Sequence, residues 1–515
     1  MRALLARVPF EGGRANLTAC VLGLLSALAL PPLHVIPVLF LTIPGLLRLI
    51  DGAGGGRRGV MAAGRRGFWF GFGLHLVGLY WITEAILLES SRYWWFVPLA
   101  VPALSMLLAL FIAVPCAAAR AVAPGWRRVA FLAGAWVLCD LARQFIGTGF
   151  PWNPLGSVWA IPGAMGDVMI QPAAWVGTPG LTLATVLLAG LPSLGWRGSA
   201  AACVALAAWA AAGAARLREP DGPGQGIDVV LVQGNVAQGQ KWDRTVAEAA
   251  FRRHLALSAQ GVAAAGARPS VVVWPETASA PFLLQSDVAA REAIAQAIAP
   301  ARGAIIGTLT FTSGLPSSDP ANEPFNSMVA MRKDGSIAGL YDKWHLVPFG
   351  EYAPTWVPLA IQIVPGHFGF GKGPSTLRLP DVPAFGGLIC YEAIFPGQVA
   401  DEADRPDWLV NITNDAWFGN STGPRQHLAA ARLRAVEEGL PLMRAANTGI
   451  TAGFDARGRE LGRLAMGVAG ELTLALPPAR PVTSFAHLGL AIPGLLAFTA
   501  MAAGIRGRRQ AWLCF

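Results

Sequence analysis

The chain has 515 residues, of which 54% are hydrophobic and only 14% are charged, and its mean hydropathy is positive. Soluble domains carry about 25% charged residues, so the composition excludes a wholly soluble protein. The net charge of +9 could suggest nucleic acid as a partner. However, only four of the 40 basic residues are lysines, and many of the 36 arginines flank apolar segments. That pattern is typical of membrane proteins, whereas nucleic-acid binders gather charge on one soluble face.

The apolar segments divide the chain into parts. Residues 1–217 and 481–505 are apolar runs broken by arginine clusters, while residues 225–478 have the composition of a soluble domain. The Gly/Pro-rich stretch Glu219–Gly226 joins the two kinds of sequence. We therefore predict a membrane bundle over residues 1–217, a globular domain over 218–480, and a last span with its tail over 481–515.

About 20 apolar residues cross a bilayer. Windows of this length predict about eight transmembrane helices, near residues 16–33, 34–50, 67–88, 95–119, 129–146, 172–195, 198–216 and 483–505. The first two are short and form a hairpin through Pro31 and Pro32. Residues 1–30 are similar to a signal peptide, but no convincing cleavage site precedes Pro31 and more spans follow. We therefore expect a helix there.

Arginine clusters predict the orientation of these helices. They lie before span one, between spans two and three, and after spans four, six and eight, at Arg2, Arg7, Arg14, Arg57, Arg58, Arg65, Arg66, Arg120, Arg127, Arg128, Arg197, Arg506, Arg508 and Arg509. The alternate loops carry only Arg92. Because cytoplasmic loops are enriched in Lys and Arg, both termini are expected in the cytoplasm. Seven crossings then put the globular domain outside.

A few polar residues fall within the predicted spans. Asp140 and Arg143 are three positions apart and are expected to neutralise each other on one helical face. His75 and Glu84 share the predicted third span. They could line a cavity that opens outward, or they could be buried against neighbouring helices. Burial is favoured for His75, and both alternatives stay open for Glu84.

The globular domain has an alternating pattern of short apolar runs and helical stretches. The predicted strands are Ile227–Gln233, Ser270–Trp274, Ala304–Leu309, Ser327–Met331, Phe385–Ile389, Trp408–Ile412 and Leu442–Ala446. Helices are predicted over Trp242–Ala265 and over Pro424–Glu438, with Gly439 just past the end of the second. This alternation predicts an α/β domain, in which chemistry takes place beyond the carboxyl ends of the strands.

Three reactive side chains lie at or near such positions. Glu276 ends Val-Val-Val-Trp-Pro-Glu, Cys390 ends Gly-Gly-Leu-Ile-Cys, and Lys343 lies in a loop before His-Leu-Val-Pro-Phe-Gly-Glu. Each alone is ordinary, since a strand-end cysteine is more often buried filler and a loop lysine is usually solvated. Together they supply a base, a cation and a nucleophile. The other five cysteines have no metal-binding spacing, and we predict no metal or cofactor.

These motifs resemble the Glu-Lys-Cys signature of the nitrilase superfamily. With Asn411–Gly419, Gln426-His427 and Arg444–Gly449, the chain resembles the apolipoprotein N-acyltransferases over nearly its whole length. The resemblance implies an αββα sandwich on a bundle of about eight spans. It also implies a bacterial inner-membrane enzyme whose catalytic domain is periplasmic.

The resemblance assigns roles to individual residues. Glu276 is expected to take the thiol proton of Cys390, because a free thiol ionises only near pH 8.5 and needs a base or cation nearby. Lys343 is expected to favour the thiolate and then the oxyanion, with the Tyr391 backbone N–H as a second oxyanion donor. Glu351 is expected to orient Lys343. Glu392 is also assigned to the supporting set, and the substrate-binding candidates are Trp242, Asn414, Trp417, Phe418, Phe368, Phe370 and Arg444.

The implied reaction has two steps. Cys390 attacks a phospholipid acyl ester and forms a thioester, and the α-amine of a diacylated apolipoprotein then takes the acyl chain. Tyr352–Lys372, rich in aromatic and aliphatic residues, is predicted to be a mobile amphipathic arm that touches the bilayer; a packed loop is the alternative. Two other functions remain open: a membrane-tethered amidase that uses water as acceptor, and a receptor that only binds ligand. An intact set of three reactive residues argues against the receptor.

Overall fold

The computed structural model describes residues 12–88, 90–238, 244–316, 319, 321–354 and 367–505. The chain divides into two compact units. A helical unit comprises Met1–Thr83, Tyr93–Arg218 and Leu488–Phe515, and a second unit comprises Glu84–Arg92 and Glu219–His487.

The helical unit contains a helix near each of the eight predicted spans. These helices are α2 (Gly12–Ser26), α3 (Leu39–Asp51), α4 (Gly56–Gly78), α7 (Val97–Arg120), α8 (Trp126–Phe145), α10 (Ala173–Gly190), α11 (Trp196–Arg218) and α16 (Ala491–Ile505), with the short α9 (Ala164–Ile170) before α10. Within the part of the chain that the structure describes, four stretches are long and apolar enough to cross a membrane: Gly12–Ala29, Trp94–Arg120, Ala173–Leu194 and Trp196–Arg218. Ala491–Ile505 is a shorter apolar helix. The described residues therefore support a membrane bundle with at least four candidate spans.

The predicted third span, residues 67–88, is wrong at its carboxyl end. Helix α4 ends at Gly78, whose carbonyl accepts a hydrogen bond from the Asn153 side chain (2.9 Å). Glu84 lies on a separate short helix, α5 (Ile82–Leu87), which is followed by α6 (Ser90–Tyr93). Glu84 belongs to the second unit, and its carboxylate lies against Gly419. His75 and Glu84 are therefore not on one helix.

Other polar residues of the helical unit behave as expected. Arg143 Nη2 lies 3.2 Å from Asp140 Oδ1, so the predicted pair is confirmed. His75 is buried, as the favoured reading had it. Neutralisation within the helix lets α8 carry two charged groups among apolar neighbours.

The second unit is built on two six-stranded sheets. The first has the order β12-β1-β2-β3-β4-β5 and the second β11-β10-β9-β8-β7-β6. Their bounds are β1 (Asp228–Gln233), β2 (Ser270–Val273), β3 (Gly303–Phe311), β4 (Pro324–Arg332), β5 (Ile337–Asp342), β6 (Thr376–Leu379), β7 (Val382–Ile389), β8 (Trp408–Thr413), β9 (Leu442–Ala446), β10 (Thr451–Phe454), β11 (Glu460–Leu464) and β12 (Gly470–Ala475). Besides α5 and α6, most of whose residues belong to this unit, the described α-helices are α12 (Arg244–Ala265), α13 (Val288–Ala297), α14 (Gly423–Glu438) and α15 (Ser484–Leu488).

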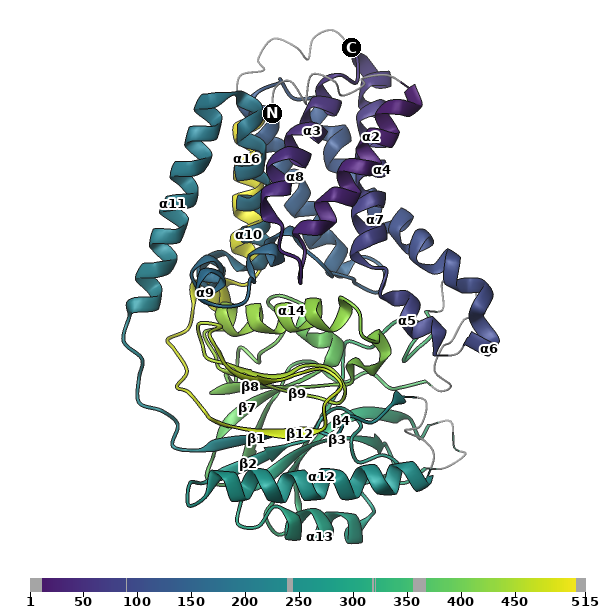
Figure 1. Ribbon diagram of the computed structural model, residues 1–515, viewed down its shortest axis with the longest axis vertical. Helices are drawn as coiled ribbons and strands as arrows, with labels where there is room; N and C mark the ends of the chain where they lie inside the picture. The colour runs from purple at the N-terminus through teal and green to yellow at the C-terminus, as the bar shows by residue number, and fades with distance from the viewer. Residues whose placement is uncertain are drawn as a thin grey trace. The chain divides into compact units, whose positions relative to one another are not determined.

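The two sheets pack face to face between helices, which gives four layers (Figure 1). Apolar side chains of both sheets, such as Val273, Ile305, Phe385 and Val410, form the central core. A second core lies between the first sheet and α12 and α13, and a third between the second sheet and α14. This arrangement is the αββα sandwich that the resemblance implies.

Strand direction brings the carboxyl ends of several strands to one edge. Strands β1, β2 and β3 are parallel, as are β7, β8 and β9. Strand β5 runs with β3, because each is antiparallel to β4. Glu276 therefore follows β2, Lys343 follows β5 and Cys390 follows β7 in regions where catalytic groups of α/β domains gather.

The seven predicted strands are confirmed within two or three residues at each end. The α14 prediction is also confirmed, and Gly439 caps it in the left-handed conformation (φ 66°). Strands β5, β6, β10, β11 and β12 were not predicted. Strands β5 and β12 are largely half-exposed, β11 is mostly exposed, and all three lack a run of apolar residues, while β6 and β10 have only four residues each.

A close approach between β3 and the loop after β2 requires glycine at position 307. A Cβ there would lie 2.2 Å from the Pro275 carbonyl oxygen and 2.7 Å from the Glu276 Cα. We predict that Gly307→Ala lowers the unfolding temperature of the purified protein by several degrees, since overpacking a core costs about 1–3 kcal/mol. Gly224→Ala, where the nearest atom is 4.0 Å away, is the control and should unfold like the unchanged protein. Equal unfolding temperatures for both variants would contradict this packing argument.

Candidate active site

Glu276, Lys343 and Cys390 are all buried in the second unit. Their exposed fractions are 5%, 1% and 5%. Glu276 and Lys343 are in direct contact, with Lys343 Nζ 3.2 Å from Glu276 Oε1. The same ammonium lies 2.9 Å from the Glu351 carboxylate. The structure therefore brings the predicted base, cation and orienting carboxylate together, although Glu276 and Glu351 lie 75 residues apart in sequence.

Lys343 is held in its charged form. Burial opposes the charge, but the Glu276 and Glu351 carboxylates outweigh it and raise the pKa of Lys343 above its usual value. Its backbone N–H also donates to the Asn326 carbonyl (2.9 Å). A buried ammonium between two carboxylates has little freedom to move, as the predicted oxyanion role of Lys343 requires.

Asn326, which the sequence analysis missed, connects the two carboxylates. Its Nδ2 donates to Glu276 Oε1 (2.7 Å) and to Glu351 Oε1 (2.8 Å). The other Glu276 oxygen accepts the backbone N–H of Asn414 (2.8 Å), and Glu351 accepts the N–H of Val347 (2.8 Å). Asn326 lies inside β4, so only the side-by-side position of β4 and β5 could reveal it.

Cys390 begins a short 3₁₀ turn, η7 (Cys390–Ile394), in a left-handed backbone conformation (φ 49°). Glu392 holds this turn: its carboxylate accepts the N–H of Ile389 (2.6 Å), the N–H of Trp344 (2.7 Å) and the Tyr341 hydroxyl (2.8 Å). Burial raises the pKa of Glu392 to about 7. These bonds tie the Cys390 turn to the Lys343 loop, which supports the predicted supporting role of Glu392.

The Cys390 thiol is neutral at rest. Burial raises its pKa, the Glu276 carboxylate raises it further, and the Lys343 ammonium and a hydrogen bond with Thr413 lower it. Glu276, Glu351 and Lys343 together carry one net negative charge. Moving the thiol proton to Glu276 neutralises that carboxylate and leaves a thiolate, so the total charge of these three residues and Cys390 is unchanged and the thiolate forms without adding buried charge.

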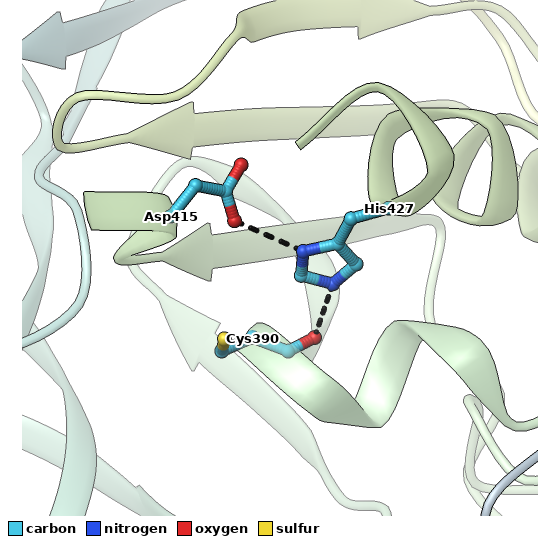
Figure 2. Close-up of side chains that lie close together, drawn as sticks. All are labelled: Cys390, Asp415 and His427. Atoms are coloured by element: carbon cyan, nitrogen blue, oxygen red, sulfur yellow. Dashed lines mark hydrogen bonds and ion pairs between the residues drawn. The ribbon is translucent and has the colours of Figure 1, made fainter. Parts of the chain in front are cut away.

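A second polar cluster lies behind Cys390, and Figure 2 shows three of its members. His427 Nδ1 is 3.0 Å from Asp415 Oδ1, and His427 Nε2 is 2.9 Å from the Cys390 carbonyl oxygen. Donor atoms of Cys390, Asp415 and His427 lie within 4.8 Å of one another, a spacing that could suit a metal. However, both ring nitrogens already face partners, and Arg444 and Lys343 supply positive charge nearby. The arrangement favours a hydrogen-bonded network over a metal centre.

The predicted substrate-binding residues lie in different environments. The Asn414 side chain donates to Gln238 (2.6 Å) and accepts from Asn447 (2.9 Å). Arg444 is fully buried and bonds to Asp415 (2.7 Å) and Asn411. Trp417, Phe418 and Phe368 are half-buried, and Phe370 is 54% exposed. Trp242 lies outside the described residues. Substrate contact stays a prediction for all seven, and the internal bonds of Asn414 and Arg444 favour a positioning role for these two.

The geometry defines a class: an αββα sandwich with a buried Glu, Lys and Cys at the carboxyl ends of its strands. The description of the matching family model for residues 229–470 is carbon-nitrogen hydrolase. Residues 22–191 match the apolipoprotein N-acyltransferase N-terminal domain. A solved amidase from Nesterenkonia sp. covers 50% of this chain and 93% of its own, with 20% identity and a TM-score of 0.35.

Curated relatives extend the match to the whole chain. An apolipoprotein N-acyltransferase of Bradyrhizobium diazoefficiens is 39% identical over 96% of this chain and 96% of its own. One of Rhodopseudomonas palustris is 38% identical over 93% of this chain and 92% of its own. The chain belongs to the apolipoprotein N-acyltransferase family, and the resemblance found in the sequence is confirmed.

The effect of the Lys343 ammonium on the thiol pKa predicts how fast Cys390 is alkylated. Lys343→Met removes the ammonium that lowers the thiol pKa, so alkylation of Cys390 by iodoacetamide at pH 8 should slow about tenfold or more, one pKa unit being tenfold in thiolate. Mass spectrometry of peptides separates Cys390 from the other cysteines. Lys333→Met, at an exposed turn, is the matched control. An unchanged alkylation rate in Lys343→Met would rule out the proposed electrostatic link.

Proposed function

We propose that Cys390 is the nucleophile, Glu276 the general base and Lys343 the oxyanion-stabilising cation of this acyltransferase. Family membership makes the chain an acyltransferase of lipoprotein maturation. The observation that carries the residue assignment is the buried Lys343 ammonium, held by two carboxylates and acting electrostatically on the Cys390 thiol.

The first step forms a thioester from a phospholipid. Cys390 Sγ attacks the carbonyl carbon of an acyl ester while its proton passes to Glu276. The carbonyl oxygen becomes an oxyanion that Lys343 and the Tyr391 N–H stabilise. The ester C–O bond then breaks, and Glu276 returns the proton to the leaving alkoxide, which departs as a lysophospholipid.

The second step transfers the acyl chain to nitrogen. The α-amine of a diacylated apolipoprotein attacks the thioester carbon, and an amine proton passes through Glu276 to the departing Cys390 sulfur. A thioester suits both steps, because the thiolate adds readily and the acyl-enzyme stays reactive toward an amine. No cofactor is required by this balance of bonds and protons.

The substrates explain the presence of a membrane unit. We propose about eight spans, with both termini in the cytoplasm and the catalytic unit in the periplasm of a bacterial inner membrane. The alternation of arginine-rich and arginine-poor loops supports this orientation. Both proposed substrates are lipids anchored in the bilayer, so a catalytic unit outside the cytoplasm could reach phospholipid and exported lipoproteins.

We also propose that Tyr352–Lys372 is an arm that contacts lipid. Residues 355–366 lie outside the described residues. At the ends of this segment, Phe370 is 54% exposed and packs edge-on against Tyr352 at 5.1 Å. An exposed aromatic ring beside an apolar segment is consistent with contact to lipid, and it also fits a packed loop.

An amidase is the second candidate, because the family model that matches residues 229–470 is described as carbon-nitrogen hydrolase. The acceptor separates the two functions. With phospholipid alone, a transferase should accumulate acyl-enzyme, seen as a mass increase of one acyl chain that Cys390→Ala lacks. Adding a diacylated lipopeptide with a free α-amine should remove that increase and give the N-acylated peptide. Rapid release of fatty acid with no amide product would identify a hydrolase.

The orientation has its own prediction. A reporter that is active only outside the cytoplasmic membrane should work when fused after Gly226 and fail when fused after Arg509, because an odd number of crossings separates the two positions. Fusions after Arg197, in a predicted cytoplasmic loop, provide an internal negative control. The reverse pattern of reporter activity would overturn the proposed topology.

A further inference from the structure

The peptide group that follows the nucleophile is unusually well held. Cys390 has φ 49°, a left-handed conformation that non-glycine residues rarely adopt and that persists only when the surroundings hold it. The side chain and carbonyl of Cys390 point to different sides (Figure 2), and the carbonyl faces His427. The mechanism described above does not use His427.

The hydrogen bonds of His427 indicate that its Nε2 carries a proton. The Cys390 carbonyl is only an acceptor, so the 2.9 Å contact requires a proton on Nε2. Nδ1 lies 3.2 Å from Arg444 Nη2, which is only a donor. Burial, together with the charge of Arg444, lowers the pKa of His427. A proton on Nε2 satisfies the contact with the Cys390 carbonyl, and Nδ1 lies between the donor Arg444 and the acceptor Asp415 Oδ1 (3.0 Å).

The ring is fixed by groups that are themselves buried. Asp415 Oδ2 accepts from Arg444 (2.7 Å), and Asp415 Oδ1 accepts from the Thr413 hydroxyl (3.0 Å). Despite burial, Arg444 and His427 lower the pKa of Asp415, which therefore stays ionised. His427, Arg444 and Thr413 are 0% exposed and Asp415 is 1% exposed. The network leaves His427 one orientation.

The peptide bond links this network to the oxyanion. A trans peptide is planar, and its C=O and N–H point in opposite directions. Fixing the Cys390 carbonyl toward His427 therefore fixes the direction of the Tyr391 N–H. We propose that His427 is a positioning residue: it holds the Cys390–Tyr391 peptide so that the Tyr391 N–H is aimed at the developing oxyanion.

This inference rests on the proposed function, in which Cys390 attacks and the Tyr391 N–H receives the oxyanion. It assigns His427 no proton transfer, because Nε2 is occupied by a carbonyl and Nδ1 faces Arg444 and Asp415. A misaligned donor affects the transition state more than the bound substrate. The expected effect is therefore on the rate constant for thioester formation, with little change in the phospholipid concentration at half-saturation.

Two substitutions of similar length separate donation from packing. In His427→Gln, the amide nitrogen can donate to the Cys390 carbonyl and the amide oxygen can accept from Arg444. In His427→Met, no donor remains. We expect His427→Met to slow thioester formation about tenfold to a hundredfold at saturating phospholipid, below the 10²–10³ seen when an oxyanion donor is lost altogether. His427→Gln should recover most of the rate. Intact-mass measurement of the acyl-enzyme over time provides both values.

The control variants distinguish a failure of this proposal from a failure of folding and from a failure of the proposed function. His254→Met replaces another buried histidine of the same unit, whose Nδ1 bonds to the Ala250 carbonyl (2.8 Å), and should leave the rate unchanged. If His427→Met does not fold, His427→Asn, which is too short to reach the carbonyl, takes its place. Equal losses in the Gln variant and the donor-free variant, or a near-normal rate in the latter, would overturn the proposal. Thioester formation in Cys390→Ala would instead overturn the proposed function itself.

Discussion

The catalytic unit depends on one buried charge, the Lys343 ammonium. It sits between Glu276 and Glu351, and Asn326 bridges the same two carboxylates. Removing one partner of a buried ion pair leaves an uncompensated charge and costs about 3–5 kcal/mol. The loops that follow β2 and β5 and the strand β4 are therefore tied to one another through this cation. Rigid loops are what a site needs if its donors are to meet a developing charge without moving.

Two polar networks flank Cys390, and they differ in net charge. On one side, burial and the Glu276 carboxylate raise the pKa of the Cys390 thiol, the Lys343 ammonium lowers it, and Glu276 is the proposed base for its proton. On the other side, Asp415 and Arg444 cancel each other around a neutral His427. The first network can exchange a proton with the thiol at constant charge. The second holds the Cys390 backbone through the bond between His427 and the Cys390 carbonyl, and its Asp415 carboxylate contributes to the raised pKa of the thiol.

The membrane unit and the catalytic unit differ in which polar groups they bury and in how those groups are satisfied. Helices satisfy their own backbone hydrogen bonds, which is what a bilayer demands. The sandwich instead buries charged side chains in a water-accessible fold by pairing each with partners. Lipid substrates and polar acyl chemistry require both environments in one chain, and the curated relatives align with it across both units.

The sequence by itself determined seven central strands and the positions of Glu276, Lys343 and Cys390 just past three strands. These features are local: a run of branched residues predicts a strand, and a reactive residue just past it lies at the carboxyl end.

The tertiary structure decided which residues lie in contact, because sequence spacing does not show how distant strands pair. Asn326, Tyr341 and Thr413 lie within or at the end of strands and resemble ordinary strand residues until the neighbouring strands bring them to Glu276, Glu392 and Cys390. Asp415 and His427 were visible in a motif, but their partners are a backbone carbonyl and an arginine that only the packing of α14 against the second sheet brings within hydrogen-bond distance. Glu84 lies outside the helix of the predicted third span because α4 ends at Gly78, where the Asn153 side chain donates to the last carbonyl, and hydropathy averaged over a window cannot detect such an end.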